Sequence, residues 1–490
     1  MGLAANLRAQ GGLPCRPWPR HPVSPAQWSA LAAEPGLALV ALWGEALAVH
    51  ALWRDAEGML AVSVPVVDGR YPALSPQRPA AVLFERALSD LWGHAADGAV
   101  DARAWLDHGA WEVSSPLVAR PPPRAAVTPP GEAGPAGGLD QVPIGPLAGG
   151  IAEAGQFRLF VRGGHIARVQ ARLGWLHKGV PALMRGKSPR AASRFAARLA
   201  GDAPVAHGIA FARAAEAASD MLPPPRALAL RAAIAEAERM AMHLADIAAL
   251  AAAAGAPLVA AQCQRHREAL LRAGARAFGH RLMMDVVVPG GLATDIAPEG
   301  EEALRAAAAA LVCDLAELGG LCAPLLRRLE GVGMVSPALA TALAAGGPAG
   351  RASGAATDLR RGPGYRPYHD LNVAPVREVA GDAAARLLVW LAELRDSARM
   401  VRTVLAELPG GEIVATLPMV TGEGFGWAEG PRGGIWTWLR LEGGQIAGAF
   451  QRDPGWLHLP MLEGAARGAD LADWPLVRAS FGISHAGMDL

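Results

Sequence analysis

A proline-rich segment at residues 116–140 is the feature that most restricts what this chain can fold into. It contains the run Arg120-Pro-Pro-Pro-Arg124, followed by alternating prolines and glycines up to Gly138. Proline removes a backbone donor and fixes φ, so this composition favours extended chain over packed helix or sheet. We therefore predict a linker at residues 116–140, a small domain at residues 1–115 and a large domain at residues 141–490.

The first section alternates short apolar runs with turns. Residues 37–43 and 46–53 are rich in strand-forming residues and flank Gly44 and Glu45, which predicts a hairpin, and residues 59–67 predict a third strand. Residues 79–91 change to helical spacing. We expect a small α/β sandwich-like domain.

The last section is mainly helical, with peripheral strands. Strands are predicted at 157–162 and 165–173 around Gly163-Gly164, and again at 435–441 and 445–451. The apolar spacing predicts three long helices, at 226–250, at 301–318 before Gly319-Gly320, and at 382–408 before Gly410-Gly411. Asp382 is placed to cap the third helix. The predicted fold class of the whole chain is α+β.

Charge and cysteine content exclude several functions. The chain has 46 Lys and Arg against 45 Asp and Glu, so no net field favours nucleic acid or an anionic membrane surface. Its four cysteines show no C-x-x-C spacing, which is typical of a reduced, cytosolic protein, and we expect Cys263, Cys313 and Cys322 to be packed hydrophobic residues. The most apolar stretch, residues 247–261, is broken by Gly255 and Pro257, so no transmembrane segment is predicted.

Short motifs follow one another in a characteristic order along the first section. They are Tyr71-Pro-Ala-Leu-Ser75, Pro79-Ala-Ala81, Glu85-Arg86, Asp90-Leu-Trp-Gly93 and Asp101-Ala-Arg103. Together they resemble the small accessory domain of respiratory complex I that is fused ahead of the large subunit in formate-hydrogenlyase-type hydrogenases.

A second series of motifs covers the large section. It comprises Pro143-Ile-Gly-Pro146, Gly174-Trp-Leu-His-Lys-Gly179, Glu238-Arg239 with His243, Gly279-His-Arg281, Pro289-Gly-Gly291, Arg351-Ala-Ser-Gly354 with Asp358 and Arg360, Gly381-Asp382 with Arg386, Gly422-Glu-Gly424, and Pro431-Arg-Gly433. The series resembles the large subunit of membrane-bound nickel-iron hydrogenases of group 4, the formate hydrogenlyase and hydrogenase-4 type. It also resembles the C/D-like fusion of NADH-quinone oxidoreductase, which is complex I.

The chain departs from the hydrogenase pattern where the metal would bind. Ala200, Ala203, Ser484 and Gly487 stand at the four positions where the resemblance implies nickel-binding cysteines. A nickel-iron centre needs soft thiolate ligands, which these residues do not supply. The resemblance therefore implies a nickel-free protein, and the end of the chain at Leu490 fits that expectation.

The complex I pattern is also incomplete. That relative has a tyrosine where Gly201 stands and a histidine where Ala148 stands, two groups that would meet a quinone headgroup. Neither glycine nor alanine offers a side-chain proton donor. Any quinone chemistry would therefore need other residues.

Several polar residues remain as cavity candidates. We call residues 198–207 and 484–487, where the four cysteines are replaced, the two degenerate segments. If these segments converge, then one cavity would be lined by His207, Ser484 and His485. His207 could be a proton carrier or a hydrogen-bonded structural histidine. His207 and His485 with Asp202 and Asp489 could form a different metal site, although the spacing matches no known pattern.

A charged group follows a glycine-rich loop. Arg351, Asp358, Arg360 and Arg361 could orient redox chemistry or form a structural ion-pair network, and the sequence leaves both interpretations open. Glu238, Arg239 and His243 are interpreted as polar anchors on one face of a core helix.

The resemblance implies a membrane-associated, energy-converting oxidoreductase complex. The chain would bind no cofactor directly and would pass electrons to a quinone or another acceptor. Its expected partners are an iron-sulfur small subunit that carries the cluster and antiporter-like membrane subunits, and its expected place is the cytoplasmic side, peripheral on the inner face of the membrane. Two alternatives stay open: an inactive scaffold bridging those partners, and an active hydrogenase that uses other ligands.

Overall fold

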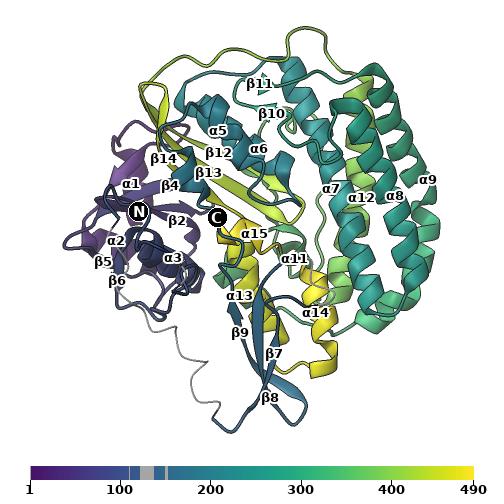
Figure 1. The fold of residues 1–490 in the computed structure, drawn as a ribbon, viewed down its shortest axis with the longest axis horizontal. Helices are drawn as coiled ribbons and strands as arrows, with labels where there is room; N and C mark the ends of the chain where they lie inside the picture. The colour runs from purple at the N-terminus through teal and green to yellow at the C-terminus, as the bar shows by residue number, and fades with distance from the viewer. Residues whose placement is uncertain (1, 110, 122–136, 149–152) are drawn as a thin grey trace.

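The computed structural model describes residues 2–109, 111–121, 137–148 and 153–490 (Figure 1). The central part of the predicted linker, residues 122–136, lies outside the described residues. The division into domains at 1–115 and 141–490 stays a prediction. The α+β fold class is confirmed, with several small sheets beside a helical bundle.

The N-terminal section is built on a four-stranded sheet in the order β1-β4-β3-β2. Its strands are β1 (Arg20–Pro22), β2 (Ala38–Glu45), β3 (Ala48–Arg54) and β4 (Met59–Pro65), antiparallel except for the β1–β4 pair. The predicted hairpin exists, but it turns at Ala46 and Leu47 rather than at Gly44 and Glu45. Gly44 lies inside the ladder because α3 approaches it closely: a Cβ there would come within 2.7 Å of Leu88.

Helices and a short strand pair surround this sheet. They are α1 (Leu3–Ala9), α2 (Pro25–Ala33), η1 (Pro79–Ala81), α3 (Val82–Trp92), β5 (Arg70–Pro72) and β6 (Ala95–Asp97). The predicted helix at 79–91 is confirmed, with a 3-10 first turn. It ends at Gly93, whose φ of 71° is a left-handed cap.

Two three-stranded antiparallel sheets belong to the larger section. The first consists of β7 (Asp140–Ile144), β8 (Gln156–Arg162) and β9 (His165–Arg172), and the second of β12 (Gly422–Gly430), β13 (Gly433–Glu442) and β14 (Gln445–Arg452). The four predicted strands are confirmed, whereas β7 and β12 were missed. In β12, glycines occupy positions of close approach. Its Gly424 and Gly426 lie under the backbone of α6 (Pro204–Ala218), where any Cβ would collide, so glycine here permits close packing.

Four long helices pack side by side: α7 (Pro225–Ala253), α8 (Pro257–Phe278), α9 (Pro298–Leu329) and α12 (Ala383–Ala406) (Figure 1). Asp382 caps α12 as predicted, since its side chain accepts from the Ala385 backbone N–H at 2.8 Å. Two predicted ends were wrong. Helix α9 continues through Gly319-Gly320 because its buried apolar stripe continues to Leu329, and α12 ends at Ala406, before Gly410-Gly411.

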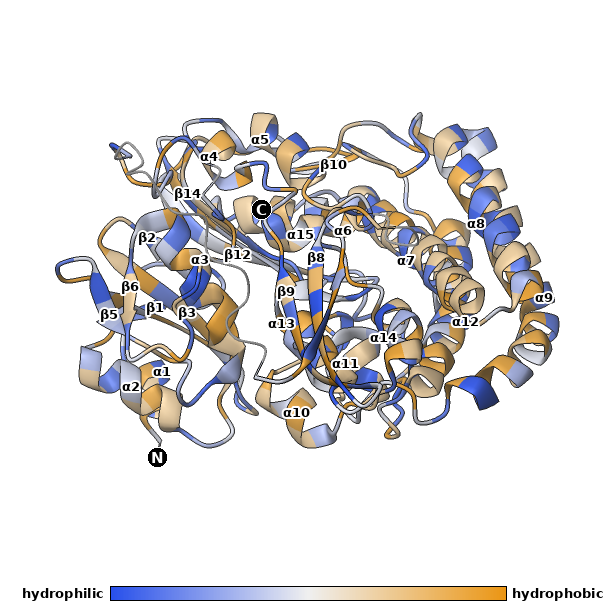
Figure 2. Cartoon of the chain, turned by 60° about the horizontal axis from the view of Figure 1, so that its bottom comes forward, coloured by the Kyte–Doolittle hydropathy of each residue, from blue (hydrophilic) through white to orange (hydrophobic). Residues whose placement is uncertain are grey.

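Helix α9 contains the longest apolar, charge-poor stretch of these helices. In Figure 2, α8 carries many hydrophilic residues, whereas α9 is mainly hydrophobic. By length and composition α9 could cross a membrane, but it also packs against α8 and α12, so this is weak evidence for a span. Cys263 and Cys322 are buried as predicted. Cys313 is exposed, which corrects the prediction, because it lies on the outward face of α9.

Shorter elements complete the larger section. They are α4 (Val180–Met184), α5 (Pro189–Ala196), β10 (Val287–Val288), β11 (Gly291–Leu292), α10 (Pro337–Ala342), α11 (Gly347–Ala352), η2 (Arg360–Gly364), α13 (Gly455–Ala466), η3 (Leu471–Asp473), α14 (Trp474–Phe481) and α15 (Ala486–Asp489). The last three helices and η3 form the segment that the sequence left unassigned.

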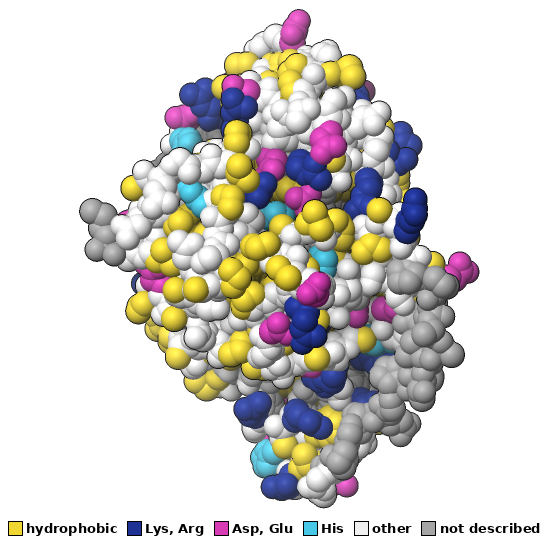
Figure 3. Space-filling model, turned by 90° about the vertical axis from the view of Figure 1, so that its left-hand side faces the viewer, with side chains coloured by type: hydrophobic (Ala, Val, Ile, Leu, Met, Phe, Trp, Pro, Cys, Tyr) yellow, Lys and Arg dark blue, Asp and Glu magenta, His cyan; other side chains and the backbone are white. Residues whose placement is uncertain are grey.

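Aromatic contacts join the N-terminal section to the rest of the molecule. Trp43 stacks on Phe450 with ring centroids 5.7 Å apart, and Phe84 stacks on Trp456 at 4.8 Å. On the face shown in Figure 3, basic and acidic side chains are interleaved with hydrophobic ones, in keeping with the near-zero net charge. One hydrophobic core therefore runs through both sections.

Removing the Phe84 ring tests this shared core. Phe84→Ala should lower the free energy of unfolding by about 3–5 kcal/mol, since it deletes a buried aromatic side chain and leaves a cavity. Urea denaturation followed by tryptophan fluorescence measures the loss. Leu47→Ala, at a side chain that is 79% exposed, is the control and should change stability by no more than about 0.5 kcal/mol. Equal midpoints for the two variants would contradict the packing described.

Candidate functional site

The two degenerate segments meet at Asp453. Ala200 and Ala203 precede α6, whose His207 places Nε2 3.1 Å from Asp453 Oδ2, with both side chains buried. Gly487, at the start of α15, lies on the other side of the same carboxylate: a Cβ there would come within 2.4 Å of Asp453 Oδ2. The convergence expected from the sequence is therefore present.

A largely buried arginine lies beside this meeting point. Arg432, in the turn between β12 and β13, contacts the Asp202 carboxylate and places Nη2 2.7 Å from Asp246 Oδ1. Burial lowers the pKa of Arg432 to about 10 and raises the pKa of Asp246 well above its usual range. We call Asp202, His207, Asp246, Arg432 and Asp453 the inner charge cluster.

The Ser484 hydroxyl is hydrogen-bonded to a carboxylate. Its Oγ donates to both oxygens of Glu153 at 3.1 Å, and the same carboxylate accepts from the backbone N–H groups of His485 and Ala486. This satisfies the first donors of α15. Ser484 is therefore held in place by a negative group.

His485 and Asp489 are directed elsewhere. The His485 ring lies with Nδ1 3.1 Å from the Ala154 carbonyl oxygen, and burial lowers its pKa. The Asp489 carboxylate accepts from the Gly174 and Leu176 backbone N–H groups, both at 2.9 Å, and burial raises its pKa to about 6. The alternative metal site proposed from the sequence is not assembled: across the residues described, no three His, Cys, Asp or Glu side chains are arranged to hold a metal.

A four-thiolate nickel centre does not fit these positions. Ala200, Ala203 and Gly487 have no ligand atom, and the Ser484 hydroxyl is a hard oxygen donor already bonded to Glu153. A longer side chain at Gly487 would also have to displace Asp453.

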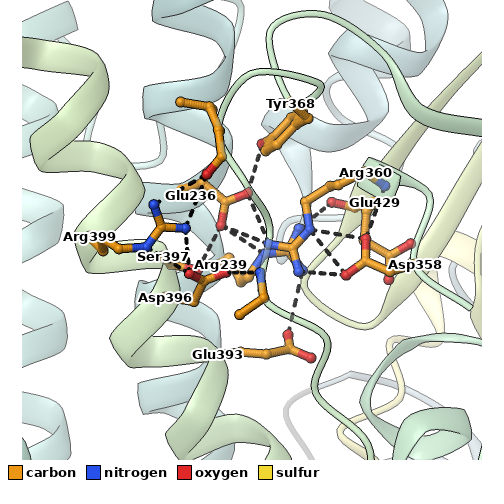
Figure 4. A network of polar contacts seen from close by, with 12 residues as sticks. Glu236, Arg239, Asp358, Arg360, Tyr368, Glu393, Asp396, Ser397, Arg399 and Glu429 are labelled. Carbon is orange, nitrogen blue, oxygen red and sulfur yellow. Dashed lines mark hydrogen bonds and ion pairs between the residues drawn. The ribbon is translucent and has the colours of Figure 1, made fainter. Parts of the chain in front are cut away.

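A second buried group lies between the helical bundle and β12 (Figure 4). We call it the central charge network. Its members are Glu236, Arg239 and His243 of α7, Arg351 of α11, Asp358, Arg360, Glu393 of α12 and Glu429 of β12.

Two arginines predicted from the sequence are the centres of this network. Arg351 Nη2 lies 2.7 Å from Glu393 Oε1, and its Nη1 lies 2.8 Å from Glu429 Oε1. Arg360 pairs with Asp358 at 2.6 Å and reaches Glu236 at 3.1 Å. Arg361, also singled out from the sequence, is exposed and lies outside the network.

Hydrogen bonds complete the coordination of the Glu236 carboxylate. The hydroxyls of Tyr368 and Ser397 donate to it at 2.7 and 2.6 Å. His243 Nε2 lies 2.9 Å from Glu393, and Arg239 donates to the carbonyl oxygens of Glu429 and Gly430. The network thus ties α7 and α12 to β12.

The four carboxylates of the network differ in proton affinity. Burial acts to raise the pKa of each, but Arg360 and Arg351 hold the pKa of Asp358 far below its usual range, and Arg351 with His243 does the same for Glu393. Arg239 and Arg360 lower the pKa of Glu236. Burial and the nearby Asp358 raise the pKa of Glu429. Glu429 is therefore the one carboxyl group of the four whose pKa is raised rather than lowered in the network.

Glu238 lies between the cluster and the network. It faces α6, where its carboxylate accepts from the Val205 and Ala206 backbone N–H groups at 2.7 and 3.0 Å, whereas Arg239 and His243 face Glu393. All three are buried anchors, as predicted, but they do not share one direction. Burial raises the pKa of Glu238 to about 8.

Sequence reasoning missed much of both groups. The missed members are Glu236, Asp246, Glu393, Glu429, Arg432 and Asp453. Glu153, which holds Ser484, was missed as well. The i, i+3, i+7 spacing of Glu236, Arg239 and His243 could have identified one of them, because these positions share a helix face. Arg432 stood inside a quoted motif, but nothing local pairs it with Asp202 and Asp246.

Comparison with known proteins gives a consistent set of relatives. Residues 254–421 match the family described as respiratory-chain NADH dehydrogenase, 49 kDa subunit. The chain is 28% identical over 452 residues to formate hydrogenlyase subunit 5 of Escherichia coli, covering 87% of this chain and 78% of that protein. It is 28% identical over 357 residues to a component of the NADH-quinone oxidoreductase of Dehalococcoides mccartyi, covering 71% and 97%.

A solved structure shares the fold. A chain of the archaeal membrane-bound sulfane sulfur reductase superposes with a TM-score of 0.68 at 23% identity, covering 72% of this chain and 98% of that one.

The inner charge cluster can be tested through Arg432. Arg432→Met leaves the buried Asp246 and the half-buried Asp202 without their cation and should cost up to about 3–5 kcal/mol of unfolding free energy. The triple variant Arg432→Met, Asp202→Asn, Asp246→Asn should regain most of this loss. Arg402→Met, at an exposed arginine of α12, is the matched control. A single variant as stable as this control would refute the pairing.

Glu238 should make stability depend on pH. Its pKa is raised on folding, from about 4.3 for a free glutamate to about 8, so the wild type loses stability as pH rises from about 4 to 8. The Glu238→Gln side chain cannot ionise. The free energy of unfolding of this variant, relative to that of the wild type, should therefore increase across that range by a few kcal/mol. Denaturation series at pH 5 and pH 8 measure this difference in the free energy of unfolding. A difference that is the same at both pH values would show that burial does not disfavour the Glu238 carboxylate.

Proposed function

We propose that this chain is the large-subunit-like component of a membrane-associated oxidoreductase complex and works without nickel. The match of residues 254–421 to the respiratory-chain NADH dehydrogenase 49 kDa subunit family and the similarity to formate hydrogenlyase subunit 5 support the first part of this proposal. One observation carries the nickel-free part of the proposal. At the place where the two degenerate segments meet, Arg432 is paired with Asp202 and Asp246, and Asp453 fills the space beside Gly487.

The relatives support the kind of complex. Their names describe a formate hydrogenlyase, an NADH-quinone oxidoreductase and a membrane-bound hydrogenase of Pyrococcus furiosus. By analogy, this chain would lie peripherally on the cytoplasmic face of the membrane. An iron-sulfur small subunit would carry the electrons, and antiporter-like membrane subunits would move the ions.

The chain's own contribution would be to bind and protonate an acceptor rather than to carry electrons. A quinone or similar acceptor needs protons as well as electrons. Gly201 and Ala148 have no side-chain proton donor. His207 and Glu238 lie beside the degenerate segments and can carry a proton, and Glu429 lies in the central charge network. These residues are the candidates for proton supply.

A second candidate function is that of a structural scaffold. The observation in its favour is that Arg351 and Arg360 are fully buried and paired with carboxylates, which is how a purely structural network is built. In that case the chain would bridge an iron-sulfur subunit and a membrane arm without touching the acceptor.

Isolation of the native complex tests the proposal. The tagged chain, extracted gently from its own membranes, should recover an iron-sulfur subunit and multi-span membrane proteins in mass spectrometry, and should contain nickel far below one atom per chain. Stoichiometric nickel would overturn the nickel-free proposal. Recovery of the chain alone would overturn the membrane complex.

Turnover of the intact complex separates the two candidates. His207→Asn should lower the rate at least about tenfold if His207 supplies protons, because general acid catalysis contributes typically 10²–10⁴-fold. The control is His280→Asn, at an exposed histidine. Unchanged turnover in a fully assembled His207→Asn complex would favour the scaffold.

A further inference from the structure

A cavity of about 290 Å³ lies where the N-terminal section meets β9, α10 and α13. It is separate from the inner charge cluster and from the central charge network, and the proposed function makes no use of it. Its volume is near the lower end of the range for small-molecule sites.

Much of the lining of this cavity is apolar. Val82 and Leu83 of α3 face it from the N-terminal section, while Leu339, Leu343 and Leu459 face it from the rest of the molecule. Such a wall favours a hydrocarbon group, because burying apolar surface releases it from water.

The lining also contains a carboxyl group whose hydrogen-bonding positions are only partly used. Glu463 of α13 lines the cavity, and its one described partner is the Ala171 backbone N–H, which donates at 3.3 Å. Burial raises the pKa of Glu463 to about 7, against the lowering effect of Arg86 and Arg103. At slightly acid pH this group is therefore neutral and can donate a hydrogen bond.

The charges that line the cavity favour an anion. Arg86, Arg103 and Arg168 contribute three guanidiniums, whereas Asp101 and Glu463 contribute two carboxyl groups. Arg86 is already satisfied, because it donates to the carbonyl oxygens of Arg103 and Ala104 at 2.8 and 2.7 Å.

Two further donors are unused among the described residues. Arg168 is exposed, lies over the Phe160 ring at 3.8 Å and has no carboxylate partner in the described part of the chain. Trp105, which lines the cavity and is only 1% exposed, has a buried indole N–H without an acceptor there. A buried hydrogen-bond donor without an acceptor destabilises the folded protein. A ligand that supplies an acceptor to this donor would therefore bind more tightly.

We propose that this cavity binds a small amphipathic carboxylate, with its hydrocarbon part against the leucines and its carboxylate between Glu463 and Arg168. The ligand would contact both α3 and α13, so it would join the N-terminal section to the rest of the molecule. This site is independent of the oxidoreductase role proposed above.

Calorimetric titration of the purified full chain with octanoate, kept below its micellar concentration, tests the site. At pH 6 octanoate should bind saturably at one site, and octylammonium should not bind. Arg168→Ala should weaken octanoate at least about tenfold, the effect of losing one hydrogen bond to a charged group. Arg162→Ala, at an exposed arginine on β8 of the same hairpin, should leave the affinity unchanged.

Two further variants check the position and the role of Glu463. Leu343→Trp should abolish binding by filling the cavity. Octanoate affinity of the wild type should fall as pH rises through about 7, because Glu463 then becomes an anion, and Glu463→Gln should remove this dependence.

Several results would overturn the proposal. They are no saturable binding by the wild type, equal binding of octylammonium, and an Arg168→Ala variant that binds as well as Arg162→Ala. Both arginines are exposed, so these two variants remain folded and decide the question even if Leu343→Trp does not fold; circular dichroism checks this.

Discussion

Three buried guanidiniums, those of Arg239, Arg351 and Arg360, hold the helical bundle against the sheet of β12 and β13. A charge removed from water is tolerated only when it is paired and fully hydrogen-bonded. Here the pairing groups come from α7, α12 and β12, elements distant in the sequence. The relative placement of these elements therefore depends on the central charge network (Figure 4).

That placement also fixes the inner charge cluster. The backbone of α6 lies on the glycines of β12, and the turn after β12 carries Arg432 to Asp202 and Asp246. Glu238 connects α7 to the first turn of α6. Where the segments around Ala200–Ala203 and Ser484–Gly487 meet, this frame presents a salt-bridged cation and a buried His–Asp pair. Proton chemistry fits these residues, whereas soft-metal binding does not.

Sequence patterns predicted the local elements well. Helices α7 and α12, the Asp382 cap and four of the strands in the larger section follow from spacing and capping alone. Two errors occur where glycine serves close packing rather than a turn, at Gly44 and at the glycines of β12. At Gly319-Gly320 the space around both residues is open, and α9 continues because its buried apolar stripe continues to Leu329. Local spacing carries no information about which surface approaches a glycine.

The candidate site was predicted only in part. Arg351, Asp358 and Arg360 were identified as a group because they are close in sequence, and His207 because it follows a degenerate motif. Their partners Glu236, Glu393, Glu429 and Asp453 come from distant segments, so only the fold reveals them. His485 and Asp489 were expected in the same cavity, but backbone groups hold both elsewhere.

The most direct test of this account is a diffraction experiment on the native complex at the nickel absorption edge. The account predicts that the Arg432 guanidinium lies within hydrogen-bond distance of the Asp202 and Asp246 carboxylates, that Asp453 lies beside Gly487, and that no anomalous peak appears between α6 and α15. An anomalous nickel peak at that position, with Arg432 turned away from its carboxylates, would contradict it.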